Sequence, residues 1–162
     1  MKGLDIQNRI LRSGQCMKRF FLGVFAADEL EPALLNAEDK SFCVVNTHDS
    51  KQPVDQPGHW YVLFVTGKNC FELFDSLGLS EETARQRVGK DARHCVYNTL
   101  PVQTKDETCG KFATYFCVTR VLNYEETFQE VFSECLTSDL DFNEAIVDRF
   151  WHFDKLYNAK IF

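Results

Sequence analysis

Four residues of different chemical types, His59, Asp75, Gln103 and Cys109, stand at positions from which they could act together. A cysteine nucleophile needs an imidazole that takes the thiol proton and a carboxylate that holds the ring in one tautomer. It also needs donors aimed at the oxyanion of a tetrahedral intermediate. The chain holds four histidines and seven cysteines, so a His/Cys pair by itself indicates nothing. The prediction depends on where the predicted strands and helices place these four residues.

Cys109 lies where a polar loop, residues 104–108, changes into an apolar helical pattern. With Thr108 as the predicted N-cap, Cys109 falls in the first helical turn, where free backbone N–H groups and the positive dipole end favour the thiolate. Gly110 is expected to leave the approach to this thiol open. Apolar residues then recur at three- and four-residue spacing, which predicts a helix that buries one face: Phe112, Ala113, Phe116, Cys117, Val121 and Leu122.

His59 and Asp75 flank two predicted neighbouring strands. Residues 60–65 are continuously apolar and rich in β-branched and aromatic side chains, which predicts a central strand covered on both faces. A tight turn leads to residues 70–74, the predicted antiparallel partner. We therefore expect His59 and Asp75 at the same end of this hairpin. Asp75 could instead only cap the following turn, and Glu72 is the substitute carboxylate if the register differs.

The remaining pattern predicts a single domain over residues 1–162 of the α+β class. Its centre is a small, mostly antiparallel sheet packed on the helix that begins at Cys109, with additional helices around it. The last helix is expected to start near Asp139 or Asp141. The other expected features are a helix over 4–12, a strand over 20–25, a short apolar run over 41–46, a loop over 46–58, a helix over 80–90, a strand over 93–98, and a helix marked by Phe128, Val131, Phe132, Cys135 and Leu136. The last helix carries an apolar stripe that is interpreted as core or, alternatively, as a groove for a partner: Phe142, Ile146, Phe150, Trp151, Phe153 and Tyr157.

Composition and charge narrow the class of protein. A 44% hydrophobic and 26% charged chain is typical of soluble globular proteins, and a net charge of −6 argues against a large nucleic-acid footprint. The N-terminus lacks an apolar signal core and no apolar run approaches the roughly 20 residues of a membrane span. We expect an intracellular, reducing compartment. The basic residues Arg85, Arg87, Lys90 and Arg93 are interpreted as a solvated surface.

The seven cysteines are scattered through segments predicted to be core, and no two have C-x-x-C spacing. An odd number of such residues predicts neither a disulfide framework nor a structural zinc site. No metal and no cofactor are expected.

The chain order His, Asp, Gln, Cys excludes several classes of cysteine peptidase. Papain-like enzymes place the cysteine first, and caspases have a glycine where this chain has Lys111. Viral chymotrypsin-like cysteine proteases usually have a glycine two residues before the nucleophile and a strand after it, whereas here Glu107 and a predicted helix occupy those places.

Six blocks, between about Ile6 and about Leu122, resemble in their order the adenain group of cysteine peptidases, which the CE clan joins with the ubiquitin-like-protein proteases. The blocks are Phe21-Leu22-Gly23-Val24-Phe25, Val45-Asn46-Thr47, Gly58-His59-Trp60, Phe74-Asp75-Ser76-Leu77-Gly78, Val102-Gln103 and Thr108-Cys109-Gly110.

The resemblance implies roles for individual residues. His59 would be the general base, Asp75 its orienting carboxylate, and Cys109 the nucleophile. Gln103 would donate to the oxyanion from its side chain and Cys109 from its backbone N–H. Trp60 would wall the substrate cleft, which admits glycines near the scissile bond.

Two features differ from adenovirus adenain. Asp75 replaces a glutamate, as in the ubiquitin-like-protein proteases, and the part after about Tyr124 matches no known pattern. Cys95 occupies a place comparable to the adenain cysteine that links to an activating peptide, although a buried strand cysteine is the alternative interpretation. His48, His94 and His152 are interpreted as structural or exposed.

The resemblance therefore predicts a monomeric cysteine endopeptidase, encoded by a virus or a virus-like element, that cleaves capsid precursors at Gly-Gly or Gly-X-Gly sites. The expected location is the host nucleus, the cytoplasm or the virion. Three alternatives stay open: an isopeptidase acting on ubiquitin-like modifiers, a CE-clan acetyltransferase, and an inactive binding module.

Overall fold

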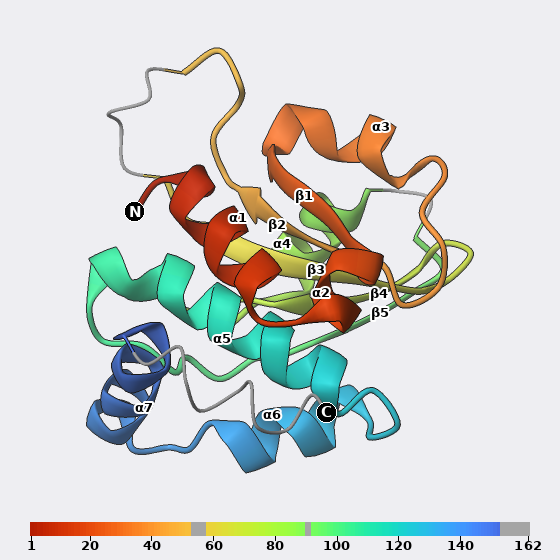
Figure 1. Ribbon diagram of the computed structural model, residues 1–162. Coiled ribbons are helices and arrows are strands. Elements are labelled where there is room, and N and C mark those ends of the chain that lie inside the picture. The colour runs from red at the N-terminus through yellow and green to blue at the C-terminus, as the bar shows by residue number, and fades with distance from the viewer. Residues whose placement is uncertain (53–57, 90–91, 153–162) are drawn as a thin grey trace.

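Five strands form one sheet in the order β1-β2-β3-β4-β5 (Figure 1). The computed structural model describes residues 1–52, 58–89 and 92–152. The central pairings β2/β3 and β3/β4 are antiparallel, and the outer pairings β1/β2 and β4/β5 are parallel. The strands are β1 (Phe21–Ala26), β2 (Phe42–Asn46), β3 (Trp60–Gly67), β4 (Cys70–Phe74) and β5 (His94–Tyr97).

The helices cover both faces of this sheet. They are α1 (Gly3–Arg12), α2 (Gln15–Phe20), α3 (Leu30–Leu34), α4 (Glu81–Val88), α5 (Cys109–Leu122), α6 (Phe128–Cys135) and α7 (Leu140–His152), with short 3-10 turns η1 (Ala27–Glu29) and η2 (Asp106–Thr108). Helices α3 and α4 connect β1 to β2 and β4 to β5, and such crossovers bring the chain back parallel to the strand it left. The predicted α+β class is confirmed, with a sheet that is mixed because of these two crossovers.

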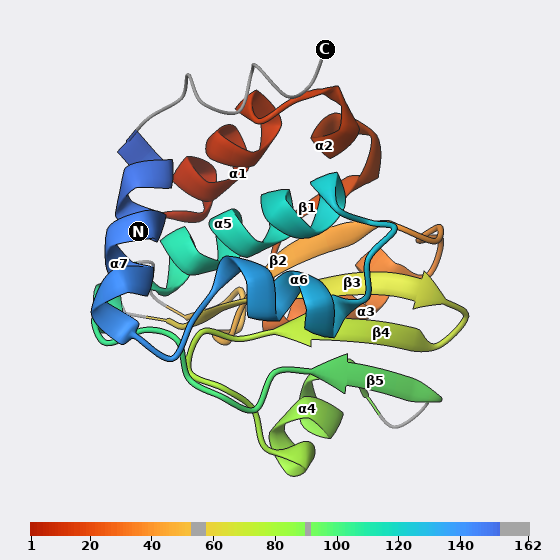
Figure 2. The ribbon, with the colours of Figure 1, turned by 90° about the horizontal axis from the view of Figure 1, so that it is seen from below.

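Two apolar clusters lie on opposite faces of the sheet, because successive side chains of a strand point to opposite sides. In β3, Val62 and Phe64 pack with α1, α5 and α6, while Tyr61, Leu63 and Val65 pack with α3 and α4. Figure 2 looks onto the sheet from the side that α6 covers, with α5 along β1 and β2 and α4 next to β5. The prediction of a central strand covered on both faces is confirmed.

Helix α5 differs from the predicted one-faced helix, since ten of its fourteen residues are buried. It contacts β3 and β2 on one side and α1, α6 and α7 on its other sides. The rings of Phe116 and Phe74 stack at a centroid distance of 4.1 Å, which ties the helix to the end of β4. Cys109 thus begins the most enclosed helix of the fold, where neighbouring groups are firmly placed.

Helix α7 begins at Leu140, between the two predicted start residues, Asp139 and Asp141. In its first turn the Phe142 N–H donates a hydrogen bond to Asp139 Oδ1 at 3.1 Å. Phe150 is buried, but Phe142 is 51% exposed and does not belong to the core stripe predicted for this helix. The predicted stripe residues Phe153 and Tyr157, and Lys90 of the basic stretch, lie outside the described residues. None of the helices in the described ranges combines the length and the apolar character needed to cross a membrane.

Candidate active site

His59 and Asp75 meet at one end of the β3–β4 hairpin, as predicted. Antiparallel pairing of Val62 with Phe74 brings the start of β3 beside the end of β4. The His59 Nε2 and Asp75 Oδ1 atoms are 2.6 Å apart. The backbone of His59 is itself held by Thr47, whose hydroxyl accepts from the His59 N–H at 3.1 Å and whose N–H donates to the His59 carbonyl at 2.9 Å.

Asp75 is fixed through its backbone as well as its carboxylate. Asn98 accepts from the Asp75 N–H at 3.0 Å and donates to the Asp75 carbonyl at 2.7 Å. The Leu77 N–H donates to Asp75 Oδ1 at 2.9 Å, so Asp75 caps the turn and contacts His59 at once. Burial alone would raise the pKa of Asp75, but the hydrogen bond from His59 and the charge of Arg87 outweigh it and lower the pKa. Asp75 is therefore an ionised carboxylate.

The alternative carboxylate, Glu72, has a different partner. Its two oxygens accept from Arg120 Nε at 2.8 Å and Nη2 at 3.0 Å, in a buried bidentate pair near the end of α5. Glu72 therefore does not replace Asp75 beside His59.

The Cys109 thiol is hydrogen-bonded to His59, and the backbone N–H groups of Trp60 and Gly110 also favour its charged form. Because Nε2 of His59 contacts Asp75, Nδ1 is the ring nitrogen left for Cys109. Burial alone raises the pKa of Cys109 and lowers that of His59, yet these contacts reverse both effects. The pKa of Cys109 falls below its ordinary value and that of His59 rises to about 9. The arrangement favours a thiolate–imidazolium pair.

The start of α5 departs from the prediction in one respect. Thr108 does not cap helix α5 with its side chain. Thr108 is the last residue of the turn η2, so its backbone already lies in the helical region. Its hydroxyl instead donates to the Lys105 carbonyl at 2.7 Å and contacts Glu144 Oε1 at 3.1 Å.

Gln103 is buried in the loop that leads to η2. Its side-chain oxygen accepts from the Ser76 hydroxyl, and its Nε2 donates to the Lys105 carbonyl at 3.0 Å. The backbone N–H groups of Val102 and Gln103 both donate to the Ser76 carbonyl, at 2.8 and 3.2 Å. These bonds tie Gln103 to the segment that follows Asp75. One N–H of the Gln103 Nε2 group remains to be donated.

Helix α7 holds the same loop, through two residues that sequence reasoning missed. Glu144 Oε1 accepts from the backbone N–H of Thr104 at 2.9 Å and of Lys105 at 3.1 Å. Asn143 Nδ2 donates to the Val102 carbonyl at 3.2 Å. The only sequence signal is a pair of polar residues beside the apolar stripe of a helix, and it does not tell which distant backbone groups they meet.

Arg87 was also missed, since the sequence places it in a solvated basic stretch. Its Nη1 contacts Asp75 Oδ2, its side chain is only 15% exposed, and its guanidinium lies 4.2 Å from the centre of the Tyr61 ring. The interpretation as solvated surface is wrong for Arg87, whereas the side chain of Arg85 is 77% exposed. A helical signal was available, because Arg87 follows the buried Ala84 by three residues and so lies near the covered face of α4.

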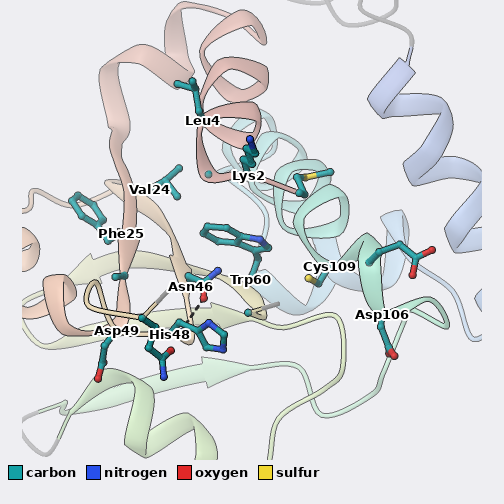
Figure 3. A pocket seen from close by; sticks show the side chains of 16 residues that line it. Lys2, Leu4, Val24, Phe25, Asn46, His48, Asp49, Trp60, Asp106 and Cys109 are labelled. Atoms are coloured by element: carbon teal, nitrogen blue, oxygen red, sulfur yellow. Dashed lines mark hydrogen bonds between the residues drawn. The ribbon is translucent and has the colours of Figure 1, made fainter. Parts of the chain in front are cut away.

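Figure 3 shows a cleft that opens beside Cys109, with Trp60 as its central wall. Its volume is about 680 Å³. Apolar and polar side chains both line it, among them Leu4 of α1, Val24 and Phe25 of β1, Asn46 at the end of β2, His48 and Asp49 in the loop that follows, and Asp106 of η2.

Two glycines allow close packing around this cleft. A Cβ on Gly58, the residue before His59, would lie 2.0 Å from Asn46 Oδ1. A Cβ on Gly110 would lie 2.6 Å from Met1 Sδ and 3.3 Å from Trp60 Cδ1. Gly110 is buried, so its missing side chain makes room for the cleft wall around Cys109.

Cys95 lies in β5, half-buried, and burial raises its pKa to about 11. All seven cysteines are free thiols, and within residues 1–52, 58–89 and 92–152 no three metal-ligating side chains gather. A link between Cys95 and an activating peptide stays a prediction. Of the remaining histidines, His94 and His152 are exposed and His48 lines the cleft.

Comparisons with known proteins give a result for the fold only. No family model and no curated protein matches the sequence. Among solved structures, the chain is similar to the ASFV pS273R protease, with a TM-score of 0.57 and 14% identity over 94% of this chain and 66% of that one. A de-sumoylating protease is similar with a TM-score of 0.48 and 13% identity, over 98% and 74% of the two chains. This chain thus spans slightly less than two thirds of the ASFV protease and shares its fold.

Proposed function

We propose that this protein is a cysteine endopeptidase in which the Cys109 thiolate is the nucleophile. The observation that carries the proposal is the hydrogen-bonded series from Cys109 through His59 to Asp75 at the end of a cleft. A lowered thiol pKa beside an imidazole whose other nitrogen is held by a carboxylate is the arrangement that activates a cysteine for acyl transfer. The fold shared with a viral protease supports this reaction class.

In the proposed reaction the Cys109 sulfur attacks the scissile carbonyl carbon, and the carbonyl π electrons move onto oxygen. Gln103 Nε2 and the backbone N–H of Cys109 stabilise that oxyanion. As the intermediate collapses, the C–N bond breaks and His59 gives its Nδ1 proton to the leaving amine. Water then attacks the thioester while His59 accepts one of its protons. The C–S bond breaks, the thiolate is restored beside protonated His59, and the carboxylic acid product leaves and loses its proton to solvent.

The cleft supports a substrate with glycines at the scissile bond. Cys109 is only 4% exposed, and Trp60 stands beside it. A Cβ near the scissile bond would compete for this space, so we propose Gly-Gly or Gly-X-Gly cleavage sites. From the resemblance to the adenain group we further propose that the substrates are capsid precursor proteins of a virus or virus-like element. The isopeptidase alternative uses the same residues, and a comparison of capsid-precursor peptides with ubiquitin-like substrates separates the two.

The test is labelling by a peptide probe that ends in Gly-Gly and carries a thiol-reactive electrophile, followed by mass spectrometry of all seven cysteines. Labelling is expected at Cys109 and is expected to disappear in His59→Ala. Cys117→Ala is the matched control on the same helix and should label like the wild type. Equal labelling of exposed Cys16 and Cys109, or cleavage by Cys109→Ala, would contradict the proposal.

A further inference from the structure

The contact between α4 and the catalytic carboxylate has no part in the mechanism above. Arg87 reaches from α4 to Asp75 Oδ2, and both side chains are largely removed from solvent, with 15% and 2% exposure. The guanidinium also lies over the Tyr61 ring of β3 at 4.2 Å. A planar cation held by a carboxylate on one side and an aromatic face on the other has little freedom to move.

The two oxygens of Asp75 serve different partners. Oδ1 faces His59 Nε2 at 2.6 Å and accepts from the Leu77 N–H at 2.9 Å. Oδ2 faces Arg87. When His59 is protonated, a single carboxylate therefore lies between two cations, and only one of them, His59, can lose its charge between pH 6 and 10.5.

We propose that Arg87 is a positioning residue that weakens the hold of Asp75 on protonated His59 and so sets the upper pH limit of the site. The inference rests on the proposed function for its catalytic meaning. A fixed positive charge on the far oxygen opposes the imidazolium and shares the carboxylate's negative charge. Protonated His59 consequently gives its proton to a leaving amine more readily than it would beside an unshared carboxylate.

Other charged groups near this series do not supply the same effect. From α5, the Cys109 thiolate faces His59 and favours its protonated form. From β3 and β2, Tyr61 and Cys43 are uncharged, because burial raises the pKa of each to about 12. Among the described residues, Arg87 is the permanently charged cation in contact with Asp75. Removing its charge should therefore strengthen the hold of Asp75 on protonated His59.

The experiment follows the His59 imidazole by NMR between pH 6 and 10.5 in the full chain, a readout that needs no peptidase activity. Arg87→Met keeps an apolar stem over Tyr61 and removes the charge, and it should raise the pKa of His59 by about one pH unit. Arg87→Gln keeps a hydrogen-bond donor without charge, should give the same increase, and serves if Arg87→Met does not fold. Arg87→Lys retains the charge and should titrate like the wild type.

The matched control is Arg85→Met, which removes the neighbouring exposed arginine of α4 and should leave the titration unchanged. In an active enzyme the alkaline limit of kcat/KM should rise with the pKa of His59, while the maximal kcat falls several-fold. An unchanged or lowered pKa of His59 in both neutral variants would overturn the role of Arg87. The NMR increase without any peptidase activity would instead count against the proposed function alone.

Discussion

Two cysteines of α5 have nearly the same burial and opposite chemistry. Cys109 opens the helix at 4% exposure, and Cys117 lies two turns later at 0%. Burial raises the pKa of Cys117 and outweighs the backbone hydrogen bonds from Val118 and from Cys117 itself, while its Sγ donates to the Thr114 carbonyl at 3.2 Å. At Cys109 the His59 ring and the backbone N–H groups of Trp60 and Gly110 lower the pKa instead. The difference is the imidazole of His59, which adds a hydrogen bond and an opposite charge at Cys109 and has no counterpart at Cys117.

The largest difference between these cysteines should appear when each is replaced by alanine. Cys109→Ala should reduce peptide cleavage by at least about a thousandfold, because no other group forms the acyl intermediate. Cys117→Ala should leave kcat within about twofold and reduce the free energy of unfolding by about 1 kcal/mol through a small cavity. Cleavage assays measure the activity of the two variants, and urea unfolding measures their stability. A similar loss of activity in both variants would contradict the distinction between Cys109 and Cys117.

Removing the imidazole should make Cys109 resemble Cys117. In His59→Gln the thiolate loses its hydrogen bond and its opposite charge, so desolvation dominates and the pKa of Cys109 rises above its ordinary value. The rate of iodoacetamide labelling at Cys109, followed by mass spectrometry at pH 7, should fall by about tenfold or more. Cys16, which is exposed, provides the internal control. Unchanged labelling of Cys109 would show that His59 does not activate it.

On helix α7, the contact with the loop before Cys109 should affect kcat more than a contact at the exposed surface does. Glu144→Gln keeps the size of the side chain but weakens its bonds to the N–H groups of Thr104 and Lys105, and we expect kcat to fall about tenfold with a smaller change in KM. Asp148→Asn is the matched control on α7, because its carboxylate is 58% exposed and pairs with Lys111 at the surface. Steady-state kinetics with a Gly-Gly peptide should show near wild-type values for this control. Equal effects of the two substitutions would argue against a specific role for Glu144.

The smallest expected effect concerns pH and stability. The pKa of His59 is raised from 6.5 to about 9 in the folded protein, so its contribution to stability is complete below pH 6.5 and declines as the pH rises through about 9. Asp75 acts in the opposite range, since its lowered pKa gives stability that is lost only in acid. Because the Cys109 thiol titrates with the opposite sign, the comparison is made without it: the difference in unfolding free energy between Cys109→Ala and Cys109→Ala/His59→Gln, measured from pH 6 to 10, should decrease with pH. A difference that grows with pH would contradict the assigned ion pair.

Local sequence pattern was sufficient for the parts of the site that neighbouring residues determine. The apolar run of β3 and the turn after it fix the hairpin register, and the register alone brings His59 to Asp75. The change from a polar loop to an apolar helix likewise marks Cys109. These predictions succeeded because strand alternation and helix periodicity are properties of short segments.

Contacts between distant segments were beyond the reach of the same reasoning. Arg87 meets Asp75 only because α4 returns over the sheet, and Glu144 meets Lys105 only because α7 packs beside α5. The local pattern of Glu144 is that of a solvated charge, and the spacing of Arg87 from Ala84 indicates a place near the covered helix face without indicating the partner. The parallel outer pairings of the sheet were missed for the same reason, since crossover direction is a property of the whole chain.

The hold of α7 on the loop before Cys109 has a consequence for the order of events during synthesis. Val102 and Thr104 precede their partners Asn143 and Glu144 by 41 and 40 positions. A chain emerging from the ribosome therefore completes Cys109 and the loop before it well before the α7 residues that hold this loop. Under the proposed function, competence to cut would follow the docking of α7, after translation has passed that helix.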